Sequence, residues 1–412
     1  MFMKRYILIV AAVAIAAVSC SKTYDVKPVS PQPIGFGIWA ESLTRTVADP
    51  TEPRVEGTNL FRAGDSFAVY GTKTDEDTTP DPTTTTVFDG VAVVATAEGG
   101  NPVAATTWDY NNHRFWDLNA ESYTFYAVSP TILKENSGFS LTPSTGALST
   151  GDLTFAGDTL DILVADKATI LKSAGSGNFN TFGIVPLTFN HAAALVDVKF
   201  KKAPALADAT VTISAITLDN IVKVASLALA TDEYNKTVST RTTVPNITIA
   251  SWTPATSSAT GSYLPAAGVT PVYGENGTSA IASNNKLTIG ETDSTFNPSS
   301  PAAPAASTFV FNNLVVVPQE FDDTKNDDVS QKLTFTYQIT VDGDTNEYPA
   351  KLWLCDFDAD NDATEGPSDQ IGSWEPGKHY IFYVTIDAHD ISFSGSIADW
   401  STTVSGYHYL VN

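Results

Sequence analysis

Residues 333–341 carry the pattern that most limits how this chain can fold. Apolar side chains stand at positions 333, 335, 337, 339 and 341, and polar side chains stand at every position between them. Successive side chains of a β-strand point to opposite faces, so this segment predicts a strand with one buried face and one wet face. Such a strand is typical of an antiparallel sandwich.

Segments of the same type recur along the chain and are rich in β-branched and aromatic residues. Turn residues lie between them, for example Glu375-Pro376-Gly377-Lys378, a candidate type II turn. No segment predicts a helix of more than about ten residues. The strand segments are residues 34–40, 66–70, 123–128, 195–200, 210–221, 380–386 and 391–397. The sequence therefore predicts an all-β sandwich architecture.

The length of 412 residues allows two such sandwiches of about 200 residues each. The strand pattern restarts just after Pro186, so we place the domain boundary there. This gives an N-terminal sandwich over residues 46–186 and a C-terminal sandwich over residues 187–412.

The balance of 23 basic and 46 acidic residues gives a formal net charge of −23. So acidic a surface repels the phosphate backbone, and we expect no nucleic-acid partner. Hydrophobic residues make up 42% of the chain, which is enough to bury a core and argues against a disordered acidic chain.

The first nineteen residues have the features of an export signal. Lys4 and Arg5 precede an apolar run over residues 6–18, which is too short to span a bilayer. The run ends in Ala17-Val18-Ser19-Cys20, which resembles a bacterial lipobox. We expect residues 1–19 to be removed and Cys20 to carry the lipid that anchors the chain in the outer membrane. The alternative is an ordinary signal peptide with a chance cysteine.

Residues 20–45 combine a tether with a single strand. Three prolines and no periodicity over residues 21–33 predict an extended linker. Ile34, Phe36, Ile38 and Ala40 then fall on one face of a strand, with glycines at 35 and 37 on the other face. Glycine weakens a strand, so this one needs a partner sheet.

Catalytic and cofactor motifs are absent from the sequence. The five histidines begin no H-E-x-x-H motif, and there is no G-x-S-x-G elbow or Walker loop. Asp358, Asp360, Asp362 and Asp369 form a weak calcium candidate, but position 6 of the loop is Ala363, where an EF-hand has glycine. A solvated acidic loop is the alternative interpretation, and we expect no cofactor and no metal.

Seven tryptophans leave two interpretations open. Exposed tryptophans can form platforms for sugars, whereas buried ones fill sandwich cores. The first interpretation would make the chain a monomeric, glycan-binding surface lipoprotein. A hydrolase with dispersed catalytic residues is a third hypothesis.

Motifs spread over nearly the whole chain resemble those of the fimbrillin family of type V pilins. They include the lipobox with a short strand after it, Thr44-Arg45-Thr46, the segments 108–116 and 123–130, and Leu187-Thr-Phe-Asn-His-Ala192. Val316-Val-Pro-Gln319, Trp374-Glu-Pro-Gly-Lys-His-Tyr380 and Ile397-Ala-Asp-Trp400 continue the pattern. The order and spacing of these motifs carry the resemblance. Val128 stands where the family usually has tyrosine.

The resemblance implies two transthyretin-like Greek-key β-sandwich domains in tandem. It also implies export as a lipoprotein and cleavage after an arginine by a surface Arg-specific protease, which removes the first strand. On this chain the removed strand is the one with Ile34, Phe36, Ile38 and Ala40. The expected bond joins Arg45 to Thr46, with Arg54 and Arg62 as fallbacks.

The family further implies that a strand from another subunit replaces the removed one. The donor expected here is the C-terminal segment, where Tyr407, Tyr409 and Val411 share one face and Val404 lies on the other. Alternatively, residues 401–412 form the last strand of their own domain or a frayed tail.

These inferences predict a structural and adhesive subunit of a cell-surface fimbria that is not an enzyme. Its expected partners are other fimbrial subunits, in a self-polymer or with tip or anchor pilins. Two further expected partners are an outer-membrane lipid, bound through Cys20, and the surface Arg-specific protease. The ligand on a host or bacterial surface is unknown. The glycan-binding lipoprotein remains the alternative.

Overall fold

In the computed structural model the chain forms strands and turns. The described residues contain two short 3-10 helices, Pro204–Leu206 and Leu354–Asp356, and no α-helix. The predicted all-β sandwich architecture is therefore confirmed. The described residues are 33–38, 61, 63–75, 83–99, 104–131, 140–142, 147–155, 162–165, 167–172, 184–187, 189–229, 251–255, 260–263, 287–289, 308–357, 370–388 and 391–399.

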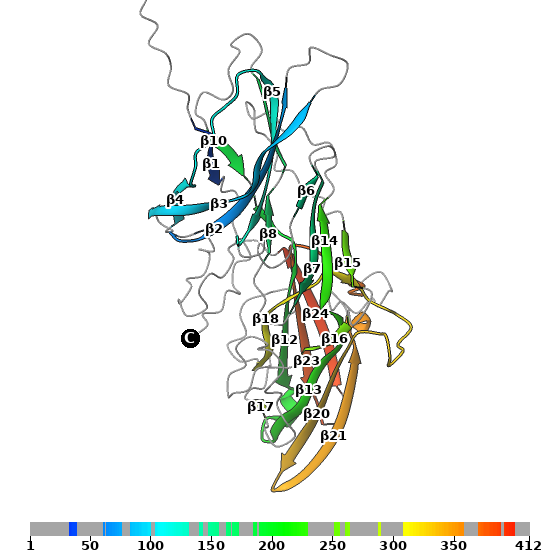
Figure 1. The fold of residues 1–412 in the computed structure, drawn as a ribbon. Coiled ribbons are helices and arrows are strands. Elements are labelled where there is room, and N and C mark those ends of the chain that lie inside the picture. The colour runs from blue at the N-terminus through cyan, green and yellow to red at the C-terminus, as the bar shows by residue number, and fades with distance from the viewer. Residues whose placement is uncertain are drawn as a thin grey trace, which may run out of the picture.

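A seven-stranded sheet forms the upper part of the molecule in Figure 1, in the order β11-β8-β5-β2-β3-β4 with β9 beside β5. Its strands are β2 (Ser66–Asp75), β3 (Thr84–Gly99), β4 (Ala104–Asp109), β5 (Ala120–Ser129), β8 (Leu163–Ala165), β9 (Ala168–Leu171) and β11 (Phe189–His191). One further pair belongs to this part: β1 (Gly35–Ile38) runs parallel to β10 (Ile184–Leu187).

Two sheets form the lower sandwich, in the orders β18-β12-β23-β24 and β16-β13-β20-β21, with β17 beside β13. Their strands are β12 (Ala194–Lys202), β13 (Thr210–Val222), β16 (Thr260–Tyr263), β17 (Leu287–Ile289), β18 (Thr308–Val316), β20 (Lys332–Val341), β21 (Asp344–Trp353), β23 (Lys378–Ile386) and β24 (Ile391–Asp399). The short strands β19 (Gln319–Glu320) and β22 (Ser373–Trp374) pair with each other.

A third sheet, in the order β15-β14-β7-β6, lies between the two parts (Figure 1). It consists of β6 (Ser140–Thr142), β7 (Ala147–Thr154), β14 (Val224–Leu229) and β15 (Ser251–Pro254). Strands from the first and second halves of the chain therefore share one sheet. Likewise β11, which follows Pro186, pairs with β8 of the upper sheet. The predicted boundary at 186/187 and the number of domains stay predictions.

The strand with the strict alternation behaves as its sequence predicts along most of its length. In β20, Leu333, Phe335, Tyr337 and Ile339 are buried, and Phe335 packs edge-on against Phe200 of the facing sheet at 4.9 Å between ring centroids. Val341 is 48% exposed, because it lies next to the hairpin turn at the far end of the ribbon. That turn is Asp342-Gly343, with φ of 53° and 93°, the left-handed conformation of a two-residue hairpin.

Along the central parts of β2 and β5 the upper sheet is apolar and buried on both faces, while β3 exposes one face at Ala92, Val94 and Thr96. Along β2, Phe67 and Val69 belong to one hydrophobic cluster, while Ala68 and Tyr70 belong to the cluster that continues into the lower sandwich. β5 alternates in the same way between the two clusters. One face of the sheet thus packs against the rest of the molecule, and the other face is where β1 and β10 lie.

β12 is buried along its whole length although it carries charged residues. Val198 and Phe200 join the core on one face, and Asp197 and Lys199 point to the other. The His379 ring of the neighbouring strand β23 lies 3.1 Å from the Asp197 carboxylate. Burial disfavours the charged form of an amine, and it lowers the pKa of Lys199 from 10.5 to about 8.

This burial predicts a rise in stability at alkaline pH. Between about pH 8 and 10.5 the unfolded chain holds a proton on Lys199 that the folded chain has lost, so the free energy of unfolding increases with pH in that window. Urea midpoints should rise between pH 7.5 and 9.5 by the equivalent of about 2 kcal/mol, and Lys199→Met should remove the rise. Lys351→Met, at an exposed lysine, is the control and should keep it. An equal rise in Lys199→Met and wild type would contradict the assignment.

Candidate functional site

The sequence predicts two segments that take part in strand exchange, the removable strand and the C-terminal donor. Of these, the structure describes the removable strand, β1. It pairs with β10 in parallel, with Gly35 opposite Ile184, Phe36 opposite Val185, Gly37 opposite Pro186 and Ile38 opposite Leu187. β10 has only four residues, and one of them, Pro186, has no N–H to give to a ladder. The backbone contribution on this side of β1 is therefore small.

Apolar side chains contribute much more to holding β1. Ile34 and Phe36 are buried, and Ile38 packs against the same cluster while partly exposed. The ring of Phe36 lies among aromatic rings from β2, β3, β5 and the end of β4. These are Phe67, Phe88, Phe125 and Tyr110, at centroid distances of 6.5, 5.3, 5.7 and 5.8 Å. We call Ile34, Phe36 and the groups that contact them the β1 site.

Close packing explains why glycine stands at position 37, on the other face of β1. A Cβ atom at Gly37 would lie 3.0 Å from the Cγ2 atom of Ile184 on β10, closer than ordinary packing allows. A larger residue there would need Ile184 to move. Gly37, which weakens the strand, therefore also lets β10 lie close beside it.

Hydrogen bonds hold the start of the segment to residues 110–115, which follow β4. The N–H of Ile34 donates to the carbonyl oxygen of Arg114 at 2.7 Å, and the Tyr110 hydroxyl donates to the carbonyl oxygen of Ile34 at 2.7 Å. Pro33 faces Phe115 in an antiparallel bridge. Burial raises the pKa of Tyr110, so its hydroxyl keeps its proton at neutral pH and remains a donor.

Three residues of the predicted removable strand lie together in the structure. The other predicted site residues are not among the residues that the structure describes. Ile34, Phe36 and Ile38 lie in the β1 site, with their apolar side chains toward the aromatic cluster. The predicted residues outside the described part are Cys20, Ala40, Arg45, Thr46, Asp358, Asp360, Asp362, Asp369, Val404, Tyr407, Tyr409 and Val411. Their roles stay predictions.

Sequence reasoning missed the parts of the site that are distant in the chain. Tyr110 and Arg114 belong to a motif that the sequence displays, but nothing in the motif shows that it contacts residue 34, which is 76 positions from Tyr110. β10 was also missed, because four residues that contain a proline give only a weak strand signal.

The tryptophans of the described residues do not form open platforms. Trp374 is buried, and Trp108 and Trp116 pack against the aromatic cluster of the β1 site. Trp252 packs against the larger core, and Trp353 is flanked by the ammonium groups of Lys332 and Lys351 at 5.5 and 4.7 Å. The described tryptophans therefore fit the interpretation that they fill the cores and their edges.

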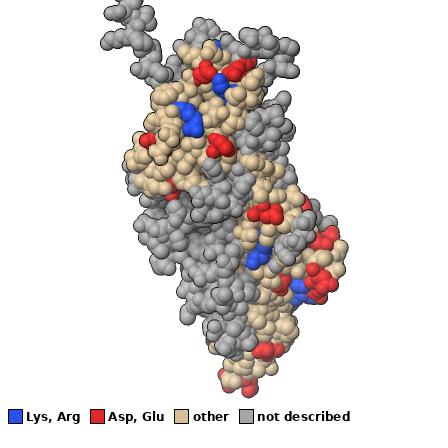
Figure 2. Space-filling model, in the orientation of Figure 1, with Lys and Arg blue, Asp and Glu red and all other residues tan. Residues whose placement is uncertain are grey.

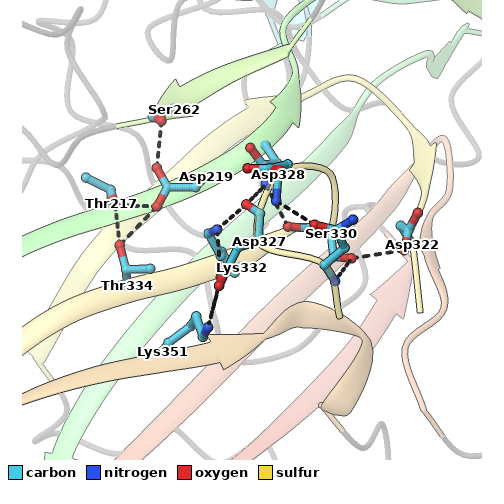
Figure 3. A network of polar contacts seen from close by, with 12 residues as sticks. Thr217, Asp219, Ser262, Asp322, Asp327, Asp328, Ser330, Lys332, Thr334 and Lys351 are labelled. Carbon is cyan, nitrogen blue, oxygen red and sulfur yellow. Dashed lines mark hydrogen bonds and ion pairs between the residues drawn. The ribbon is translucent and has the colours of Figure 1, made fainter. Parts of the chain in front are cut away.

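Carboxylates of the lower sandwich are occupied by neighbouring side chains (Figure 3). Asp219 accepts hydrogen bonds from the hydroxyls of Thr217, Ser262 and Thr334 at 2.7, 2.6 and 3.0 Å. Asp327 forms ion pairs with Lys332 and Lys351 at 3.2 and 2.8 Å. Within the described ranges, no three His, Cys, Asp or Glu residues are grouped as a metal site would require.

Neither sign of charge dominates the described part of the face drawn in Figure 2. Figure 2 shows acidic side chains scattered over this face, with a few basic ones among them and no broad basic area on its described part. None of the described segments is a helix of the length and apolarity that a membrane span needs.

Removal of the Phe36 ring should destabilise the upper part of the molecule. Replacement of a buried phenylalanine by alanine costs about 3–5 kcal/mol in protein cores, since contacts are lost and a cavity remains. We expect Phe36→Ala to lower the free energy of unfolding of residues 21–412 by such an amount in urea titrations. Ile38→Ala, at a half-buried position, should cost clearly less. A loss below about 1 kcal/mol for Phe36→Ala would contradict this assignment of the core.

Comparison with known proteins identifies the family. A family model described as fimbrillin-like matches residues 44–400, while no curated protein matches the chain. A fimbrial protein from Bacteroides vulgatus has the same fold at 15% identity and a TM-score of 0.51, over 89% of this chain and 99% of that one. A fimbrilin from Porphyromonas gingivalis is similar over 90% and 98% of the chains, at 14% identity and a TM-score of 0.35. The resemblance noted in the motifs is thereby confirmed, and the chain belongs to the fimbrillin-like family.

Proposed function

We propose that this protein is a structural and adhesive subunit of a cell-surface fimbria, which matures by loss of its first strand and assembles by β-strand exchange. The observation that carries the proposal is the β1 site. A four-residue strand covers an aromatic cluster, and few backbone bonds retain it. The family to which the chain belongs supports the fimbrial role and a place at the cell surface.

Loss of β1 would leave an apolar surface in water. The face of the upper sheet that bears Phe67, Phe88 and Phe125 would lose its cover. Burial of each large side chain is worth about 1.5–3 kcal/mol, so a replacement strand with three such residues would gain roughly 5–9 kcal/mol before any backbone pairing. Added main-chain bonds make this a β-augmentation.

The C-terminal segment is the proposed donor. Tyr407, Tyr409 and Val411 repeat the alternate spacing of Ile34, Phe36 and Ile38. Each set gives one apolar face with period two, the pattern that the β1 site accepts. The donated residues would come from a second copy of this chain or from another fimbrial subunit.

Export and processing complete the proposal. Cys20 would carry the lipid, and residues 21–33 would form a tether of up to about 40 Å between the membrane and β1. An Arg-specific protease would cut between Arg45 and Thr46, beyond the strand. No cofactor enters this scheme, and the only covalent steps are performed on the chain by other proteins.

A direct test uses the purified chain from Ser21 to Asn412, made without lipid. It is treated with an Arg-specific protease and examined on unheated detergent gels and by negative-stain microscopy. A ladder that collapses on boiling, together with an N-terminus at Thr46, would support strand-exchange assembly. A chain that is clipped and stays monomeric would count against self-polymerisation, and sugar arrays would then test the glycan-binding alternative.

The processing bond gives one prediction. Arg45→Ala removes the proposed cleavage site without touching a described contact, so the variant should fold normally and stop assembling after protease treatment. Arg54→Ala is the matched control and should assemble as wild type does. Gel ladders of normal yield from Arg45→Ala would refute the assigned bond.

The donor segment gives another prediction. A chain that ends at Trp400 should be clipped normally and fail to self-polymerise, because it has no strand to donate. It should still accept a strand, and so form a dimer with a full-length subunit. Mixtures of the truncated and full-length chains, resolved on unheated gels, separate the two roles. Normal ladders from the truncated chain alone would disprove the donor assignment.

A further inference from the structure

The Tyr110 hydroxyl occupies an unusual place beside the first residue of the β1 site. In a regular antiparallel pair, two facing residues exchange both of their N–H···O bonds. Ile34 and Arg114 make one of these bonds directly, from the Ile34 N–H to the Arg114 oxygen at 2.7 Å. The second bond is replaced by a relay. The Arg114 N–H donates to the Tyr110 hydroxyl at 3.2 Å, and this hydroxyl donates to the Ile34 oxygen at 2.7 Å.

The hydrogen bonds of this arrangement reach only the main chain of the residue that they hold. Both polar backbone groups of Ile34 are paired with Tyr110 and Arg114, while the Ile34 side chain lies in the apolar cluster. We call these two residues the Tyr110–Arg114 clamp. Because every residue type except proline offers the same N–H and C=O groups, the clamp can hold strands of different sequence.

The clamp is itself held in place. The Tyr110 ring packs against Phe36 and Phe88 at 5.8 and 5.7 Å, and the Arg114 guanidinium lies 4.9 Å over the Phe88 ring. Tyr110 is 7% exposed, so its hydroxyl points along a fixed direction. Of the two carbonyl oxygens within its reach, that of Ile34 at 2.7 Å lies much closer than that of Arg114 at 3.4 Å, so the hydroxyl donates mainly to Ile34.

The clamp distinguishes the two directions of a strand. A strand laid in the opposite direction would exchange the places of its N–H and C=O groups. Its carbonyl oxygen would then face the carbonyl oxygen of Arg114, with no proton between the two acceptors. A buried acceptor left without a donor costs about as much as a lost hydrogen bond. A shift by one residue would turn the polar groups away and the apolar side chains outward.

We propose that the Tyr110–Arg114 clamp sets the direction and register of whichever strand occupies the β1 site, so that a strand from a second copy enters in the direction of β1. For the resident strand the inference stands on the contacts alone. For the incoming strand it rests on the proposed function.

Hydrogen exchange on the chain 21–412 tests the clamp on the resident strand. Tyr110→Phe removes the relay hydroxyl and keeps the ring, so the amides of residues 34–38 should exchange about tenfold faster than in wild type. Tyr123→Phe is the matched control. Its hydroxyl lies in the same aromatic cluster and accepts the Asp117 N–H at 2.7 Å, and its loss should leave residues 34–38 unchanged. Unchanged exchange in Tyr110→Phe, or equal acceleration in both variants, would overturn the clamp.

Disulfide trapping in the assembled polymer tests the direction of the incoming strand. Phe115 is exposed and faces residue 33, the first position of the site. If Tyr407, Tyr409 and Val411 take the places of Ile34, Phe36 and Ile38, then Gly406 falls opposite Phe115; in the reverse direction, Asn412 does. Phe115→Cys combined with Gly406→Cys should therefore crosslink neighbouring subunits, and Phe115→Cys with Asn412→Cys should not. Crosslinking at 412 in place of 406 would overturn the proposed direction.

Together, the hydrogen-exchange and crosslinking experiments distinguish failure of the clamp from failure of the proposed function. If wild-type chains never assemble, the proposed function fails, and the exchange rates still decide whether the clamp exists. If wild-type chains assemble and Tyr110→Phe leaves residues 34–38 equally protected, the clamp fails and the function stands.

Discussion

At β2 and β5 the upper sheet is apolar on both faces, and the rest of the molecule depends on how each face is covered. Tyr70, Tyr126 and Val128 on one face merge into the core that extends through the lower sandwich. Phe67, Phe88 and Phe125 on the other face pack, among the described residues, against the small two-stranded sheet of β1 and β10. A sheet with two apolar faces cannot leave one of them in water, since burial of apolar area is the main favourable term in folding.

In the contacts that hold β1 on the second face, different interactions supply the attachment energy and fix the direction of the strand. Apolar contacts around Phe36 supply most of the attachment energy, and they are not directional. Hydrogen bonds to the backbone contribute less, about 1 kcal/mol each, but they depend on geometry. A site of this kind binds any strand with apolar residues at alternate positions, and the few fixed hydrogen bonds determine how the strand lies. Gly37 adds a steric condition, because Ile184 lies close to that side of the strand.

Sequence periodicity predicted the strands well where one face is wet, and less well where both faces are buried. The alternation of residues 333–341 appears in the burial of β20 up to Ile339, and the strand at Ile34–Ile38 lies where its apolar face indicated. In β12 the face with Asp197 and Lys199 is buried as well, and a linear pattern does not show what covers a sheet. The contacts of Tyr110 and β10 with β1 were equally invisible, since they join residues far apart in the chain.

Chain connectivity explains why a strand that is so weakly paired can stay in place. Residues 39–65 link β1 covalently to β2 of the upper sheet. A short link of this length keeps the strand at an effective concentration near the millimolar range, so a strand from another molecule competes poorly. In the proposed maturation, a cut at Arg45 would end that advantage without altering a single contact in the β1 site. The resident strand would then leave at the rate set by its own contacts, and a longer strand with more apolar residues could replace it irreversibly on the timescale of assembly.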